Sequence, residues 1–117
     1  MALDTRELAQ LIFDTMDDKQ GENIVLLDIR PVSVITDYFV IGTAGNARQI
    51  KAIIEAVEEQ ARLTLGAKPT SIDGVVDSGW LLMDYGDVVV HVFDRERREF
   101  YGLEEVWAEA PLVARMA

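Results

Sequence analysis

The segment from Ser78 to Phe93, SGWLLMDYGDVVVHVF, constrains the fold most, because two apolar runs flank a short polar turn. This pattern predicts a β-hairpin whose side chains alternate between the two faces of a sheet. We expect Tyr85 and Gly86 at the centre of the turn. The pairs that follow are Trp80 with His91, Leu82 with Val89, and Asp84 with Asp87.

The two faces of this hairpin differ in polarity. One is purely apolar and predicts core positions, with Leu81, Met83, Val88, Val90 and Val92 beside Gly79. The other face mixes aromatic, acidic and aliphatic residues. Its two opposed carboxylates, Asp84 and Asp87, would repel each other by about 0.2–1 kcal/mol. Such a pair is acceptable either because Asp suits turns or because an external cation neutralises it. Two interpretations stay open: a helix of this chain covers Trp80, or the face is an interaction surface.

Two amphipathic helices and two further strands are predicted elsewhere in the chain. Capping boxes precede the helices expected at 4–20 and 46–65, where apolar residues recur at helical spacing. Strands are expected at 23–29 and 36–43. Because the segment joining them is too short for a helical crossover, these two strands should be antiparallel.

The C-terminal part of the chain has weaker patterns. Residues 66–79 are expected to be a loop and 94–99 a charged turn. A short helix is predicted at 100–107, although Gly102 inside it costs about 1 kcal/mol relative to Ala. Residues 108–117 have no clear pattern and are expected to be a flexible tail. The whole predicts one α/β domain, residues 1–117, with a mixed four- or five-stranded sheet flanked by helices.

Composition excludes several classes of function. The formal net charge is −10, which disfavours sequence-specific or non-specific nucleic-acid binding and favours basic protein partners. The chain has no Cys and one His, so disulfides, thiolate catalysis and His-rich metal sites are excluded. The longest uncharged run, Tyr38 to Ala47, is too short to span a bilayer, and the N-terminus lacks a signal pattern. We therefore expect a soluble cytoplasmic protein without membrane contacts.

Catalytic motifs are not apparent in the sequence. GTAGNARQ, residues 42–49, puts two glycines before a helix, a place where anions bind, but it lacks the Lys of a P-loop. A turn followed by a helix cap is the favoured interpretation. The candidate metal-binding carboxylates form no Asp-x-Asp pair; they are Asp28, Asp37, Asp73, Asp77, Asp84 and Asp87. The sequence thus predicts no enzyme, no cofactor and no metal.

Three segments together resemble the ribosomal silencing factor family, also called Iojap-related proteins. They are ITDYFVIGTAGNARQIKAI, GWLLMDYGDVVVHVF and RREFYGLEEVW, and they follow one another in order through Trp107. The most specific features are Trp80, the turn from Asp84 to Asp87, and the pattern Arg98-x-x-Tyr101-x-Leu103-Glu104-x-x-Trp107. Gly102 departs from what is usual in the last helix.

The resemblance implies a binding protein. Members of this family dock on the large ribosomal subunit through its fourteenth ribosomal protein, a basic protein, and sterically block joining of the small subunit. This represses translation when nutrients are scarce. The family fold is similar to that of nucleotidyltransferases but lacks their paired catalytic acids. Self-association as a homodimer off the ribosome is left open.

The resemblance also implies where the partner binds. The expected partner-binding residues lie on the hairpin: Trp80, Leu82, Asp84, Tyr85, Asp87 and Val89. Trp80 is expected to pack on apolar surface of the partner, and the two Asp to accept hydrogen bonds from its Arg or Lys. A second group is divided evenly between support and contact: His91, Arg98, Tyr101 and Glu104. The alternatives are a nucleotidyltransferase-like enzyme, with nucleotide phosphate at residues 42–46 and Mg²⁺ on Asp28 or Asp37, and a homodimeric scaffold.

Overall fold

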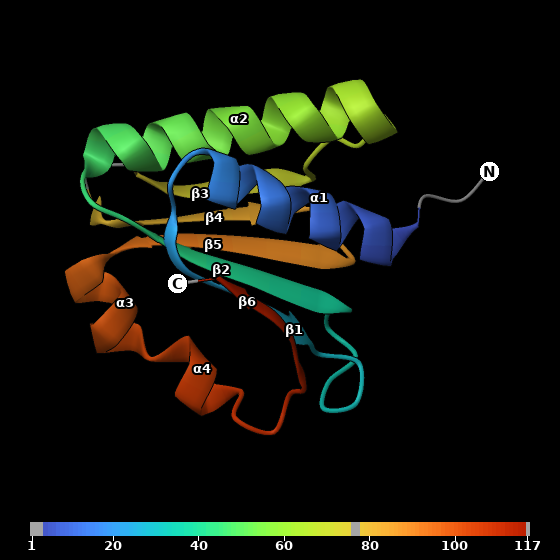
Figure 1. The fold of residues 1–117 in the computed structure, drawn as a ribbon. Coiled ribbons are helices and arrows are strands. Elements are labelled where there is room, and N and C mark those ends of the chain that lie inside the picture. Colours follow the sequence, from blue (N-terminus) through green and yellow to red (C-terminus); the bar gives the residue numbers. More distant parts are fainter. Residues whose placement is uncertain (1–3, 76–77, 117) are drawn as a thin grey trace.

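The computed structural model describes residues 4–75 and 78–116, which form a six-stranded sheet with helices on both faces (Figure 1). The helices α1 (Thr5–Asp18) and α2 (Ala47–Leu65) cover one face, and α3 (Arg95–Tyr101) and α4 (Leu103–Val106) lie on the other. The strands are β1 (Glu22–Asp28), β2 (Tyr38–Ala44), β3 (Ser71–Val75), β4 (Trp80–Asp84), β5 (Val88–Asp94) and β6 (Leu112–Met116).

The sheet is mixed, as predicted. Its strand order is β3-β4-β5-β2-β1-β6, with β2 parallel to β5 and all other neighbouring strands antiparallel. The antiparallel pairing of β1 with β2 is confirmed. Four or five strands were expected, whereas the described residues form six, because β3 and β6 add the two edges of the sheet.

Both long helices begin and end where capping chemistry places them. The carboxylate of Asp4 accepts hydrogen bonds from the backbone N–H groups of Arg6 and Glu7 at the start of α1. At α2, Asn46 accepts from the N–H of Gln49, whose own side-chain oxygen accepts from the N–H of Gly45. Gly66, with φ of 66°, ends α2 in the left-handed conformation that glycine adopts readily.

The hairpin has the predicted faces but a different register. Trp80 lies opposite Phe93, Leu82 opposite His91, and Asp84 opposite Val89. The three expected pairs, Trp80 with His91, Leu82 with Val89 and Asp84 with Asp87, are therefore wrong, because the turn is centred on Gly86 and Asp87. Gly86 takes φ of 88°, the positive value that the first central position of a II′ hairpin turn requires. This moves each partner by two residues, so every side chain stays on its predicted face.

Four predictions for the second half of the chain are corrected. Residues 94–99 are not a turn, because Asp94 caps α3 by accepting from the N–H of Arg97. The single helix expected at 100–107 is broken at Gly102, whose φ of 52° ends α3 before α4 begins. The expected loop at 66–79 contains β3, and residues 112–116 of the expected flexible tail form β6, which pairs with β1.

Candidate functional site

Trp80 is the centre of an aromatic cluster on the α3 side of the sheet. Its ring stacks on Phe93 at 5.3 Å between centroids, and Tyr101 of α3 packs on it at 4.7 Å. Phe93 is fully buried, whereas Trp80 is only partly buried and Tyr101 is exposed. The two interpretations of this face therefore each hold in part: α3 covers some of the indole and leaves the rest accessible.

His91 is buried and fixes the indole from inside the sheet. Its Nδ1 accepts a hydrogen bond from Nε1 of Trp80 at 3.4 Å, and Phe39 meets the imidazole edge-on at 5.0 Å between centroids. Burial lowers the pKa of His91 to about 4, so the ring is neutral at physiological pH. With 5 % of its surface exposed, His91 supports Trp80 and is not available for direct contact in the free chain.

Arg98 attaches α3 and α4 to the sheet. Its guanidinium donates two hydrogen bonds to the carboxylate of Glu104, at 2.9 and 3.0 Å, and one to the hydroxyl of Thr43 at 2.7 Å. A fourth reaches the backbone oxygen of Asn23 at 2.8 Å. Because the fork is planar, this arrangement fixes the orientation of both short helices. Arg98 and Glu104 thus hold in place the helix that carries Tyr101.

An accessible row extends from Trp80 along the same face of the hairpin. It contains Leu82, Asp84 and Val89, all partly buried, and Asp84 lies directly opposite Val89. Asp84 accepts from the N–H of Gly86 at 2.6 Å, which stabilises the turn. Asp87 is exposed at the tip, and its carboxylate accepts from the hydroxyl of Thr5 at 3.5 Å. Within the described residues, neither Asp forms an ion pair with Lys or Arg.

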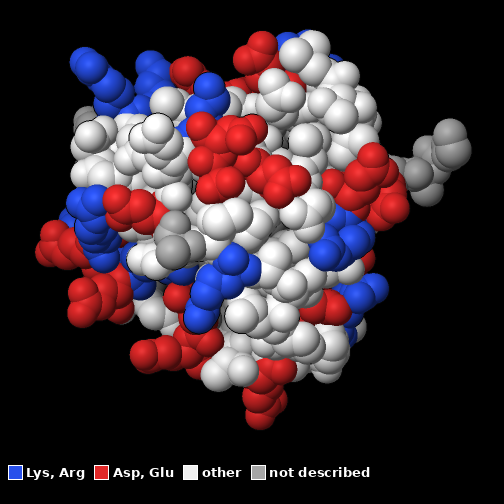
Figure 2. Space-filling view, in the orientation of Figure 1, with Lys and Arg blue, Asp and Glu red and all other residues white. Residues whose placement is uncertain are grey.

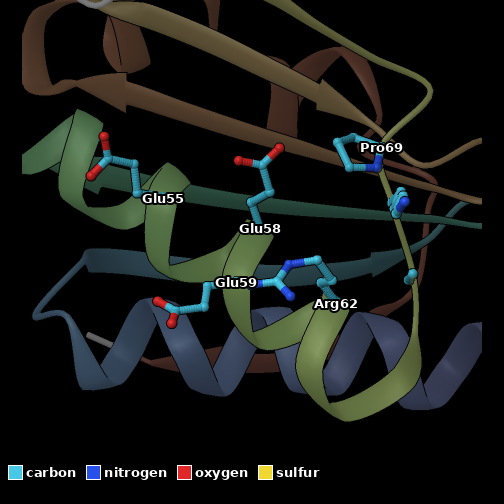
Figure 3. A pocket seen from close by; sticks show the side chains of 7 residues that line it. Glu55, Glu58, Glu59, Arg62 and Pro69 are labelled. Atoms are coloured by element: carbon cyan, nitrogen blue, oxygen red, sulfur yellow. The ribbon is translucent and has the colours of Figure 1, made fainter.

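Tyr85 is the predicted site residue that the structure separates from the others. Its side chain packs against the core cluster beneath α1 and α2, on the opposite side of the sheet from Trp80. Burial, followed by the charge of Glu58, raises the pKa of Tyr85 to about 12. Glu58 lines a depression of about 410 Å³ between α2 and the segment after it (Figure 3). The structure therefore brings Trp80, Leu82, Asp84 and Val89 together without Tyr85.

Charge is distributed unevenly over the surface. Figure 2 shows acidic side chains gathered over the layer of α1 and α2, with basic side chains scattered around them. The depression in Figure 3 has mixed charge, since Glu55, Glu58 and Glu59 lie beside Arg62 and Lys68. Among residues 4–75 and 78–116, no three His, Cys, Asp or Glu side chains are grouped so that they could hold a metal ion.

Two aromatic residues of the cluster were missed as site residues. Phe93 shares the face of Trp80, as the alternation along the hairpin predicts, but the sequence offered no reason to name it as a site residue. Trp107 packs edge-on against Phe39 at 5.3 Å between centroids, and its helical spacing and its place in the family pattern marked it in the sequence.

The segment considered for phosphate binding is a strand end and a helix cap. The N–H of Gly45 donates to Gln49, and the carboxylate of Asp28 is held by Arg30 at 2.7 Å. These contacts support the turn-and-cap interpretation. Asp77 lies outside the described residues. No helix in the described part of the chain is both long and apolar enough to span a membrane.

Comparison with known proteins assigns the family. The family model described as "Ribosomal silencing factor during starvation" matches residues 2–116. The chain belongs to the ribosomal silencing factor family. It is 36% identical to the ribosomal silencing factor of Halalkalibacterium halodurans, over 95% of this chain and 94% of that one. It is 34% identical to the ribosomal silencing factor of Bacillus subtilis, over 94% and 92% of the two chains.

A solved structure supports the same assignment. A crystal structure of a protein from Chromobacterium violaceum superposes with a TM-score of 0.84 at 28% identity, covering 91% of this chain and 88% of that one. The ribosomal silencing factor family is named for a regulatory rather than a catalytic role. Membership therefore supports a ribosome-associated role in translation silencing.

Proposed function

We propose that this chain binds the large ribosomal subunit through its fourteenth ribosomal protein and thereby prevents the small subunit from joining. Family membership supports the ribosomal target. The observation that carries the choice of surface is the partly buried Trp80, stacked on Phe93. It is continuous with an accessible row ending in acids that form no ion pair within the part of the chain that the structure describes. Repression of translation follows from occupancy of the surface alone, so no catalytic group is needed.

The chemistry of this row suits a basic protein. Trp80 is held in one orientation by His91 and Tyr101, so little conformational entropy is lost when a partner covers it. Large aromatic residues at the centre of an interface commonly carry most of its binding free energy. In this proposal, Asp84 at the end of the row and Asp87 at the turn tip accept charge-assisted hydrogen bonds from Arg or Lys of the partner.

Binding of two variants to purified large subunits tests the surface. Trp80→Ala should weaken binding by about 2 kcal/mol or more, because it removes the central aromatic contact. Asp84→Lys should weaken it as well, because a cation then faces a cationic partner. Circular dichroism and urea unfolding confirm that each variant is folded. If both folded variants co-sediment with large subunits like the parent, the proposed surface is wrong.

The same accessible surface is proposed to mediate self-association off the ribosome, in the cytoplasm where ribosomes act. A partly exposed aromatic residue, Trp80, beside aliphatic ones favours association with a second copy when the partner is absent. Light scattering with and without the isolated ribosomal protein distinguishes exchange of one interface for another from a permanent dimer. A dimer that persists when the ribosomal protein is bound would contradict a shared surface.

A further inference from the structure

A cavity separates α4 from the connection between β1 and β2. It has a volume of about 380 Å³, and the residues that line it are Val32, Glu105, Val106, Trp107, Ala108 and Glu109. Both segments project from the same side of the sheet, the side that carries α3 and α4 (Figure 1). We call this cavity the α4 groove.

Exposed apolar residues lie in both segments that flank the α4 groove. Val106 is 69% exposed, and in the β1–β2 connection Val34 and Ile35 are 102% and 66% exposed. Trp107 is partly buried and packs edge-on against Phe39, so this wall of the groove is anchored to the core. Clustered exposed apolar residues are uncommon on a monomer and mark sites of interaction.

The β1–β2 connection holds these apolar residues on an ordered backbone. The N–H groups of Val32 and Ser33 donate to the carbonyl of Ile29, at 3.0 and 2.9 Å. The N–H of Ile35 donates to the hydroxyl of Ser33 at 3.2 Å. At its end, the N–H of Asp37 donates to the carbonyl of Asp87 at 2.9 Å. The connection is thereby joined to the turn of the hairpin, which fixes its position relative to the sheet.

The charge of the groove indicates which kind of side chain it binds. Glu105 and Glu109 lie at the groove and are exposed, and within the described ranges neither has a salt-bridge partner. An apolar wall with carboxylates beside it matches a side chain that has an aliphatic stem and a cationic end. Lys and Arg are the side chains of this kind.

We propose that the α4 groove, together with Val34 and Ile35 of the β1–β2 connection, binds a Lys- or Arg-bearing segment of the large-subunit protein, as a second contact distinct from Trp80. This inference rests on the proposed function. The two contacts would lie at different places on the side of the sheet that carries α3 and α4, so the partner surface would be engaged at two points. Each of the two contacts can then be tested by its own mutations.

Two groove variants with matched controls on α2 test the proposal. Glu109→Lys is compared with Glu59→Lys, an exposed acid on the opposite side of the sheet, so that the change in net charge is identical. Ile35→Ser is compared with Leu63→Ser, because these side chains are 66% and 62% exposed. The dissociation constant for purified large subunits is measured at one fixed salt concentration. We expect increases of about tenfold for Glu109→Lys and about fivefold for Ile35→Ser, and less than about twofold for the controls.

The outcomes separate this inference from the function on which it depends. If the parent binds and Trp80→Ala weakens binding, but both groove variants behave like their controls, the inference is overturned and the proposed function is kept. If Glu109→Lys and Glu59→Lys weaken binding equally, overall charge and not the groove is responsible, which also overturns it. If the parent does not bind large subunits, the proposed function and this inference fail together.

Discussion

The two faces of the sheet are covered in different ways. On one face α1 and α2, of 14 and 19 residues, enclose an aliphatic cluster in which Met16, Ile53 and Val90 have at most 1% of their surface exposed. On the other face α3 and α4, of seven and four residues, lie over a cluster rich in aromatic rings. There Trp80 and Trp107 remain partly exposed.

Helix length explains the difference. A helix rises about 1.5 Å per residue, so α2 extends for about 28 Å and α3 for about 10 Å. A seven-residue strand such as β5 extends for about 23 Å, so α3 cannot cover it from end to end. The uncovered part contains Val89, beside Leu82 and Asp84. The long helices therefore close one face, whereas the short ones leave an accessible surface on the other.

The largest expected effect is a loss of stability on the closed face, the one covered by α1 and α2. Ile53→Ala should lower the free energy of unfolding by about 3 kcal/mol, because a side chain with 1% exposure is replaced by a cavity. Binding of the folded variant to large subunits should be unchanged. Urea unfolding measures the first and co-sedimentation the second.

Leu63→Ala is the matched control for this prediction, since Leu63 lies on the same helix and is 62% exposed. Its effect on the free energy of unfolding should be within about 0.5 kcal/mol. A loss of binding in folded Ile53→Ala would contradict the separation of the two faces.

The closed face was also the one that the sequence predicted best. Apolar spacing and the capping residues Asp4 and Asn46 are local signals, and they identified α1, α2 and the core-facing side of the hairpin. The face of the sheet on which each hairpin side chain lies was predicted correctly, although the pairing register was not. A shift of the turn centre by one residue moves partners by two, which preserves the face of every side chain.

What the sequence did not predict depends on contacts between distant segments. β3 and β6 have short, irregular patterns and are strands because β4 and β1 pair with them. The number of groups that Arg98 contacts follows from the tertiary fold, since Thr43 and Asn23 are far from it in sequence. Likewise, that Tyr85 points away from Trp80 follows from the position of the turn centre, which the pattern alone does not determine.

A smaller loss of stability is expected when the attachment of α3 and α4 to the sheet is removed. Arg98→Ala should lower the free energy of unfolding by about 2 kcal/mol, because it removes hydrogen bonds to a carboxylate and leaves Thr43 without its partner. It should also weaken binding to large subunits, because Tyr101 is then no longer held on Trp80. Arg98→Lys should restore only part of either property, since an ammonium cannot reproduce the planar fork. Full recovery in Arg98→Lys would show that charge alone matters.

The smallest expected effect is a pH dependence that arises on the open face only. Because burial lowers the pKa of His91 to about 4 in the folded chain, from 6.5 when unfolded, the unfolded state binds the proton first as pH falls. Stability is full above the unfolded value and is lost as pH falls toward the folded one. Between pH 7.5 and pH 5.5 the loss should be about 1 kcal/mol. Urea unfolding of the parent and of His91→Gln at both pH values measures this loss of stability. The variant has no group at position 91 that titrates in this range and should lack the loss.

The pKa values of Glu22 and Asp28 are lowered by their arginine partners, so these acids remain ionised across this range and do not obscure the difference. Equal pH dependence in both proteins would mean that His91 is solvated in the folded chain, and that the ring beneath Trp80 is as open as the surface above it.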